Sequence, residues 1–233
     1  MFYQTSWLDI SYEAIFRNPL FELARDVKVF KIFHQHLTPR YSISSSDMQS
    51  IHGNALSDLK ARISLFRGNG MLEITVDKFS AVFKNAVGPK DIDTVKDCVG
   101  SGIAAIAEWS PDLAYREETI SLTAFLSLKG EADARDSFLH NLIGSKMAFR
   151  ADDFGASKIH TGLKAELENS GDKWIVRFDI SRSWVDSNML IVICNATYQE
   201  GGSLATFTDK TAHVSKIAND FLAKIGLVAQ ERE

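Results

Sequence analysis

The clearest pattern in the chain is an alternation of apolar and polar residues that occurs in two separate stretches. Residues 59–83 hold three such runs, LKARISLF, MLEITVD and FSAVF, with a GNG turn between the first two. Residues 163–196 hold LKAELEN, KWIVRFDI and MLIVICNA, with an SGD turn after the first run. Period-two alternation is typical of strands with one buried face. Each stretch is therefore predicted to form a three-stranded antiparallel meander, and GNG is predicted to be a hairpin turn with positive φ.

A helix is expected after each meander, because the apolar residues there recur at steps of three and four. Pro89 opens the first, at a position where the missing N–H costs nothing. A further helix is predicted over residues 131–143, followed by an irregular crossover at 144–157. The apolar stripes of the two meander helices are Ile92, Val95, Val99, Ile103 and Ile106, and Val214, Ile217, Phe221, Leu222 and Ile225.

The N-terminal region has less regular apolar patterns than the two meanders. Apolar residues at 7, 8, 10, 12, 15 and 16 indicate a loose helix, which Asn18-Pro19 would end. Residues 27–37 alternate at first and then change phase, which favours a strand with a bulge or with two buried faces. A crossover with a short helix capped by SSSD at 44–47 follows. Residues 119–128 (TISLTAFLSL) are predicted to be a strongly apolar strand.

Each half of the chain therefore has the order strand, crossover, three-stranded meander, helix. The predicted fold class is α+β, with two such repeats packed into one body. The first repeat, with the N-terminal helix, would span residues 1–109 and the second residues 110–233, with the boundary at Ser110-Pro111-Asp112. Only LKA and the turn placement are identical between the two halves. One interpretation is an internal duplication, and the other is that the two halves are unrelated meanders that look alike.

This element order resembles the unit of the SecB-like export chaperones, present here twice, over roughly residues 25–109 and 117–228. The resemblance is one of element order and rests on no specific motif. It implies apolar grooves that bind unfolded polypeptides, and assembly into oligomers. The chain is longer and less acidic than such chaperones tend to be, and no site residue is carried over.

Composition narrows the functional classes. The 233 residues carry a formal charge of −4 and no basic block, which argues against a nucleic-acid partner. No apolar run approaches the ~18 residues that a membrane helix needs. Cys98 and Cys194 both occur in apolar surroundings and are interpreted as small buried hydrophobic residues. The N-terminus lacks the basic segment and apolar core of a signal peptide, so a cytoplasmic location is expected.

His34 and His36 are the candidate metal ligands. On a strand, residues at i and i+2 share a face, so HQH could present two imidazoles to one ion. The nearest further ligands in sequence are His52 and Asp47. Histidines near the end of a strand are more often exposed to solvent or hydrogen-bonded within the structure, which is the competing interpretation.

Other candidate chemistry is weaker, and no cofactor is expected. GSGIAA at 100–105 matches a loose dinucleotide motif, but it continues a helical period and follows no parallel strand, so small residues at a helix–sheet crossing explain it better. There is no G-x-S-x-G elbow. The pairs Glu117-Glu118 and Asp152-Asp153 would diverge on a strand, and are interpreted as surface charges. A catalytic role is the least favoured hypothesis.

The remaining candidates are contacts to a partner or ligand. Arg177, Arg182 and Trp184 surround a turn, and Trp184 would either cover the edge of the core or anchor a partner. Phe125 would share one face of strand 119–128 with Ser121, Thr123 and Ser127, a face that could line a groove. If this strand lies at an edge, it could pair across a dimer, so a homo-oligomer is expected.

Two functional hypotheses follow. The first is a non-catalytic protein-binding or assembly module, with a protein partner or a second copy of the chain. The second is a small-molecule or lipid-binding protein whose ligand lies between the sheet and the helices.

Overall fold

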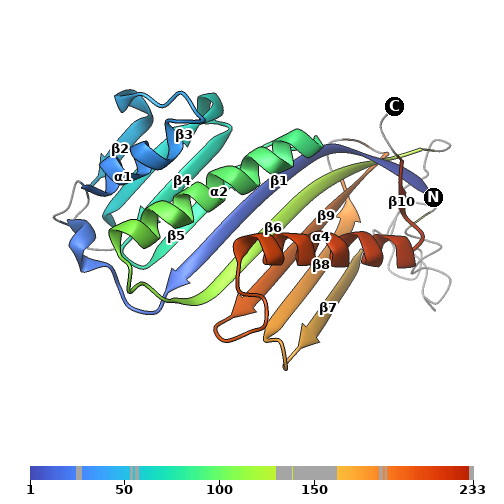
Figure 1. The fold of residues 1–233 in the computed structure, drawn as a ribbon. Helices are drawn as coiled ribbons and strands as arrows, with labels where there is room; N and C mark the ends of the chain where they lie inside the picture. The colour runs from blue at the N-terminus through green and yellow to red at the C-terminus, as the bar shows by residue number, and fades with distance from the viewer. Residues whose placement is uncertain are drawn as a thin grey trace.

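The alternating stretches form strands of a single ten-stranded sheet in the computed structural model, which is an α+β fold (Figure 1). The structure describes residues 1–24, 28–52, 55, 58–129, 138, 162–183, 186 and 188–230. In chain order, the elements are β1 (Phe2–Phe16), η1 (Phe21–Ala24), α1 (Lys28–Leu37), η2 (Ser45–Asp47), β2 (Met48–Ile51), β3 (Lys60–Leu65), η4 (Phe66–Gly68), β4 (Gly70–Thr75), β5 (Lys78–Phe83), α2 (Pro89–Trp109), β6 (Tyr115–Leu128), β7 (Leu163–Asn169), β8 (Trp174–Arg182), β9 (Met189–Gln199), α4 (Phe207–Lys224) and β10 (Val228–Ala229).

Two long strands from different halves of the chain lie side by side at the centre of the sheet. The strand order is β2-β3-β4-β5-β1-β6-β9-β8-β7, with antiparallel neighbours throughout, and β10 pairs in parallel with β1. β1 pairs with β6 from Tyr3↔Leu128 to Phe16↔Tyr115. The sheet is therefore continuous across the predicted boundary at residues 110–112.

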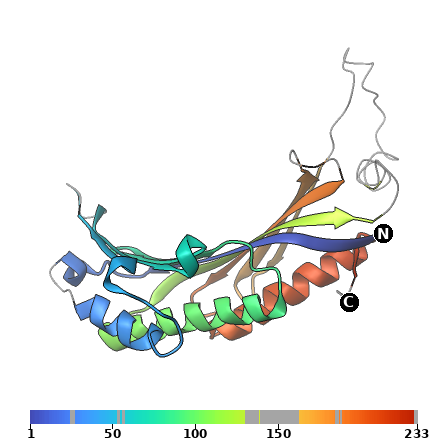
Figure 2. The same ribbon diagram turned by 90° about the horizontal axis from the view of Figure 1, so that it is seen from above.

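The helices α1, α2 and α4 lie against one face of the sheet, and none of the α-helices among the described residues lies on the opposite face, which is called the uncovered face (Figures 1 and 2). α2 crosses the first meander, where Gly102 lies against Phe79 and Leu72. α4 lies over the second meander, with Phe221 stacked on Phe178 of β8 at a centroid separation of 4.1 Å. The core between the layers is apolar, and Tyr12, Phe79 and Ile106 are among its fully buried side chains.

The predicted N-terminal helix at 7–16 is wrong: these residues belong to β1. The buried residues Ile10, Tyr12, Ala14 and Phe16 follow a strict period of two. The small side chain of Ala14 concealed that period in the sequence, and a register shift between Thr5 and Trp7 changes its phase. These features left a sparse apolar pattern that a helix could also satisfy.

The predicted strand at 27–37 is also wrong, since residues 28–37 form α1. Its buried residues are Val29, Phe33 and Leu37, spaced by four, which is helical spacing. The chain therefore enters the first meander through β1 and a crossover, but this crossover contains α1 and also a strand that was not predicted, β2, which pairs with β3.

Most of the other predicted elements are confirmed. Both meanders form, as do the two helices that follow them. The GNG turn differs in detail, because the positive φ values fall on Phe66, Arg67 and Gly68, whereas Asn69 has φ −79°. β6 forms as predicted but is not an edge strand, because β1 and β9 pair with its two sides. The predicted helix at 131–143 and crossover at 144–157 lie outside the described residues, apart from Phe138, which is buried.

The internal duplication remains a prediction. β1 and β6 are each followed by a meander and a long helix, and the two meanders flank the central pair on opposite sides. Among the described residues, however, four strands extend the sheet beyond β1 and only three extend it beyond β6.

Gly102→Ala is expected to destabilise the protein even though alanine favours helices. A Cβ at this position would lie 2.7 Å from Cζ of Phe79, a fully buried ring that has little room to move. Overpacking destabilises a protein by about 1–3 kcal/mol. The higher helix propensity of alanine than of glycine stabilises it by only about 1 kcal/mol. Urea denaturation measures the difference.

The matched control is Gly100→Ala, two residues earlier in α2, where no heavy atom lies within 4 Å of the added Cβ. This variant should be as stable as the parent chain or more stable. Equal changes in the two variants would contradict the close packing of α2 on Phe79.

Candidate functional site

The uncovered face of the sheet is the candidate functional site. Strand register assigns alternate residues to this face, because Ile10, Tyr12 and Ile120 point into the core beneath the helices. The centre of the face is built by β1, β6 and β9 and carries mainly small polar groups. Two rows of residues cross it in register: Ser11, Ser121 and Asn195, and Glu13, Thr119 and Thr197.

An aromatic row lies toward one end of the same face. Trp7 of β1 is in register with Phe125 of β6, which is in register with Ile191 of β9. The Trp7 side chain is 39% exposed, Phe125 is half-buried and Ile191 is buried. The Trp7 Nε1–H donates a hydrogen bond of 2.5 Å to Asp9 Oδ1, which orients the indole on the surface. An oriented, exposed indole beside a second ring is a common anchor for a protein partner.

The charged residues of this face form cross-strand ion pairs. Arg62 Nη2 lies 2.7 Å from Glu73 Oε2, Lys78 Nζ lies 2.6 Å from Glu13 Oε2, and Arg177 Nε lies 2.6 Å from Glu166 Oε2. Acidic side chains outnumber basic ones, so the face lacks the positive stripe that phosphate binding requires. The charged residues at its paired strand positions are Lys60, Arg62, Lys78, Lys164 and Arg177, against Asp9, Glu13, Glu73, Glu117, Glu166, Glu168 and Asp179.

Two shallow pockets lie in the second half of the sheet. One, of about 440 Å³, is lined by residues of β7, β8 and β9, including Arg177, Asp179 and Asn195. The other, of about 540 Å³, lies around the β7–β8 turn and includes Arg116, Glu117 and Trp174. Both pockets carry charges of both signs, and neither is lined by a residue of α2 or α4.

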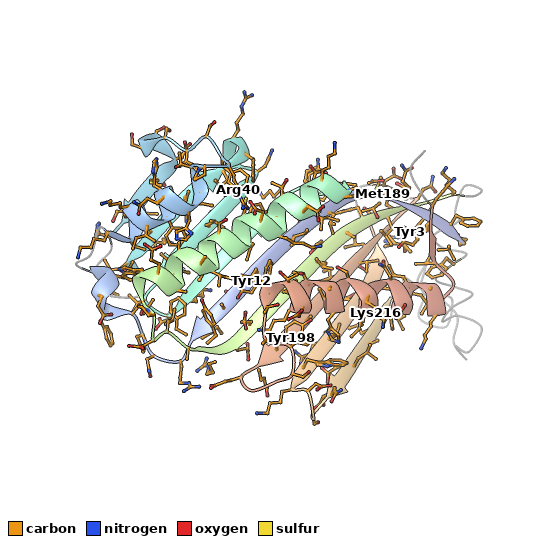
Figure 3. All side chains as sticks on the ribbon, in the orientation of Figure 1. Tyr3, Tyr12, Arg40, Met189, Tyr198 and Lys216 are labelled. Atoms are coloured by element: carbon orange, nitrogen blue, oxygen red, sulfur yellow. The ribbon has the colours of Figure 1, made fainter. Side chains whose placement is uncertain are left out.

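A buried polar network lies on the other face, beneath the first turns of α4, near Tyr12 and Tyr198 (Figure 3). The Lys210 ammonium donates to Glu118 Oε2, and Tyr12 Oη donates to Glu118 Oε1 at 2.5 Å. Tyr198 Oη donates to the Lys210 carbonyl at 3.0 Å and lies 3.1 Å from Nδ1 of His213. Thr206 caps α4 by accepting from the amide of Asp209 and so sets where the helix starts.

The centre of this network is buried. Tyr12, Tyr198 and Lys210 are each 5% exposed or less. Burial, followed by the nearby Glu118 carboxylate, raises the pKa of Tyr12 well above its usual value. The same two causes, in the same order, raise the pKa of Tyr115 to about 12. These phenols stay protonated at neutral pH, and the network anchors α4 to the sheet.

The structure places two of the four predicted contact residues on the uncovered face. Phe125 lies in the aromatic row, and Arg177 lies in the row of Ser11, Ser121 and Asn195. Arg182 ends β8 at a position that alternation assigns to the helix side, opposite Leu190. Trp184 lies outside the described residues.

The geometry that motivated the metal hypothesis is wrong. His34 and His36 lie on α1, where residues two apart point in nearly opposite directions. His34 is exposed, and His36 Nε2 is hydrogen-bonded to Glu108 Oε2 at 2.8 Å. Within the part of the chain that the structure describes, no group of three or more His, Cys, Asp or Glu residues could hold a metal ion.

The other sequence candidates have structural explanations. GSGIAA lies within α2, where Gly102 permits the close approach to Phe79. Both cysteines are buried as expected, and burial raises the pKa of the Cys98 thiol to about 11 and that of Cys194 to about 12. Glu117 and Glu118 diverge as predicted, but Glu118 was wrongly interpreted as a surface charge. Asp152 and Asp153 lie outside the described residues.

Sequence reasoning missed the Lys210–Glu118 pair. A signal was present, because Phe207, Lys210 and Val214 occupy positions spaced by three and four on one helix face. A lysine within an apolar stripe indicates a buried charge that needs a partner. The partner itself, 92 residues earlier, could not be identified from this pattern.

Comparisons with known proteins identify no family. No protein-family model matches the chain, and no curated protein matches it. Among solved structures, TBP from Methanococcus jannaschii aligns with 96% of this chain and 99% of its own, at 12% identity and a TM-score of 0.28. A likeness at that score supports no inference about fold or function. Among the described residues, no helix has both the length and the apolar character needed to cross a bilayer.

Proposed function

We propose that the protein is a non-catalytic binding module that holds a polypeptide partner on the uncovered face of its sheet. The observation that carries this proposal is the arrangement of the layers: the helices cover one face, and the exposed indole of Trp7 lies on the other, in register with Phe125. A SecB-like role and a cytoplasmic location belong to the same proposal, and the free, buried cysteines are compatible with that location.

The chemistry of the face favours a polypeptide over other partners. Hydroxyl and amide groups at its centre can donate hydrogen bonds to a peptide backbone and accept them from it. The Trp7–Phe125 row can bury an apolar side chain of the partner. The paired charges beside these groups leave no net positive surface for nucleic acid.

A non-catalytic role is favoured by where the titratable groups lie. General acid–base and nucleophilic chemistry need groups that converge on one accessible point. The Glu118–Lys210 pair, around which Tyr12 and Tyr198 gather, is largely buried, and the open pocket at the β7–β8 turn contains no histidine or cysteine. Three ion pairs across neighbouring strands hold Glu73, Glu13 and Glu166 of the uncovered face against basic side chains.

Trp7→Ala is expected to weaken binding of a reduced, carboxymethylated test polypeptide by about 30-fold, the effect of losing an aromatic hot spot worth about 2 kcal/mol. Phe125→Ser should weaken binding in the same direction, because it removes the neighbouring ring. Isothermal titration calorimetry with the full chain measures both dissociation constants.

The matched control is Phe21→Ser, which removes an aromatic ring that is 58% exposed in η1 and belongs to none of the strands. This variant should bind as the parent chain does. If the parent chain does not bind the polypeptide, or if all three variants weaken binding equally, the uncovered face is not the binding site for unfolded polypeptides.

The alternative, a small molecule or lipid between the sheet and the helices, has less support. The space between these layers is filled by large side chains such as Tyr12, Phe79 and Ile106. The two pockets described above open elsewhere, at the β7–β8 turn and on the uncovered face.

A further inference from the structure

The sheet ends in two edge strands of unequal character. β2 has four residues, whereas β7 has seven and within the described residues pairs only with β8. β7 contains no proline or glycine, and its pairing with β8 has no bulge. Proline, bulges, short length and charged side chains are the usual means by which proteins keep an edge strand from pairing with another chain. β7 has only the charged side chains, Lys164, Glu166 and Glu168, whose effect on pairing depends on the register, and its Leu167 is 37% exposed.

Geometry limits how the β7 edges of two copies could pair. In an antiparallel pair of two β7 edges, the two facing residues must either both direct their backbone N–H and C=O groups toward the other copy or both direct them away from it. This requires that the two residue numbers of each facing pair add to an even number. The allowed registers are therefore centred on a single residue that faces itself.

Side-chain chemistry distinguishes these registers. Centring on Lys164 or Glu166 places a like charge directly opposite itself, and centring on Leu167 places Glu166 opposite Glu168. Centring on Ala165 instead places Lys164 opposite Glu166 of the second copy, and Leu163 opposite Leu167 of the second copy. Each of these contacts occurs twice because of the symmetry.

The ion pairs already present within one chain extend this match. Lys164 Nζ lies 3.2 Å from Asp179 Oδ2, and Arg177 Nε lies 2.6 Å from Glu166 Oε2. Both are cross-strand pairs in the β7–β8 register. In the Ala165-centred register, the charges along one row would read Asp179, Lys164, then Glu166 and Arg177 of the second copy. The signs would therefore alternate across the interface.

We propose that two copies of the chain join through the edges of β7, antiparallel and centred on Ala165. This dimer would place the two ten-stranded sheets edge to edge, with both helix layers on the same side and the two uncovered faces continuous. The interface does not depend on the proposed function, since β9 and β8 separate β7 from β6 and β1, the strands that carry Phe125 and Trp7.

Native mass spectrometry and sedimentation of the full chain provide the test. The parent chain should have twice the 25.9 kDa chain mass. Lys164→Glu and Glu166→Lys should each raise the dimer dissociation constant about tenfold or more, because each replaces two attractive cross-strand pairs with two repulsive ones. An equimolar mixture of these two variants should regain the dimer mass, because the altered positions then face each other with opposite charge.

Gln49→Glu on β2 is the control, because it makes a charge change at the opposite edge and should leave the dimer intact. Circular dichroism and urea midpoints must show that each variant is folded. A monomeric parent chain, or a dimer that neither charge variant weakens, would overturn the proposal. Loss of the dimer without recovery in the mixture would overturn the register.

A second measurement tests the register without altering charge. Ala165→Cys should form a disulfide-linked dimer on mild oxidation, because facing Cβ atoms lie about 4.5–5.5 Å apart. Leu167→Cys should not, because that residue would face Leu163 of the second copy. The native cysteines are buried and should not compete. Equal cross-linking by both variants would contradict the Ala165-centred pairing.

Discussion

Lys210→Met is expected to lower the free energy of unfolding by about 3–5 kcal/mol, the usual cost of leaving a buried charge without its partner. The Lys210 side chain is 6% exposed and that of Glu118 is 13% exposed, so water can replace little of the lost interaction. Among the described residues, Glu118 would keep the side-chain hydrogen bond from Tyr12. Urea denaturation followed by circular dichroism measures the loss.

The control for this prediction is Lys78→Met, which removes the half-exposed Lys78–Glu13 pair and should cost no more than about 1 kcal/mol. Adding Glu118→Gln to Lys210→Met should restore part of the lost stability, because the unpaired carboxylate is then gone. If Lys210→Met costs no more than Lys78→Met, α4 is not anchored through this pair.

Phe79→Ala is expected to destabilise the protein by about 3–5 kcal/mol, as large-to-small changes of buried aromatic residues do. Phe79 lies on β5 and has no exposed surface. It contacts residues of both the sheet and the helix layer. Its ring centroid is 6.0 Å from that of Tyr12 on β1 and 6.3 Å from that of Phe33 on α1, and it packs against Gly102 of α2. Chemical denaturation provides the measurement.

Val82→Ala, on the same strand but on the uncovered face, is the matched control and should cost roughly 1 kcal/mol. A double variant adds a further test. In a Phe79→Leu background, Gly102→Ala should lose most of its penalty, because the ring that the new methyl would meet is gone. Additive effects would mean that the two residues do not share one packing contact.

Much of the fold could be predicted because its elements carry complete local patterns. The meanders β3–β5 and β7–β9 alternate over whole strands, and α2 and α4 repeat their apolar residues over several turns. At the N-terminus, a helix was predicted where β1 forms and a strand was predicted where α1 forms. The pattern of β1 is interrupted by Ala14 at a core position and by a change of phase near Trp7, and α1 spans only ten residues. Short or interrupted periods leave helix and strand equally compatible with the sequence.

The candidate site was only partly predictable. Phe125 was identified as part of a strand face that could line a groove, and Arg177 as a possible contact, but their common face depends on β6, β9 and β8 lying side by side. Trp7 was counted toward a helix, so its place beside Phe125 was missed. His34 and His36 were expected to share one face of a strand, but both lie on α1.

By itself, the sequence determined the α+β class, both meanders and the helices that follow them, because hydrophobic periodicity is set by neighbouring residues. Only the tertiary structure decided that β1 pairs with β6, that the helices cover one face and leave Trp7 and Phe125 on the other, and that Lys210 meets Glu118 beneath α4. These outcomes depend on contacts between residues far apart in the chain. Such contacts form only when apolar faces are buried together, and no local pattern specifies them.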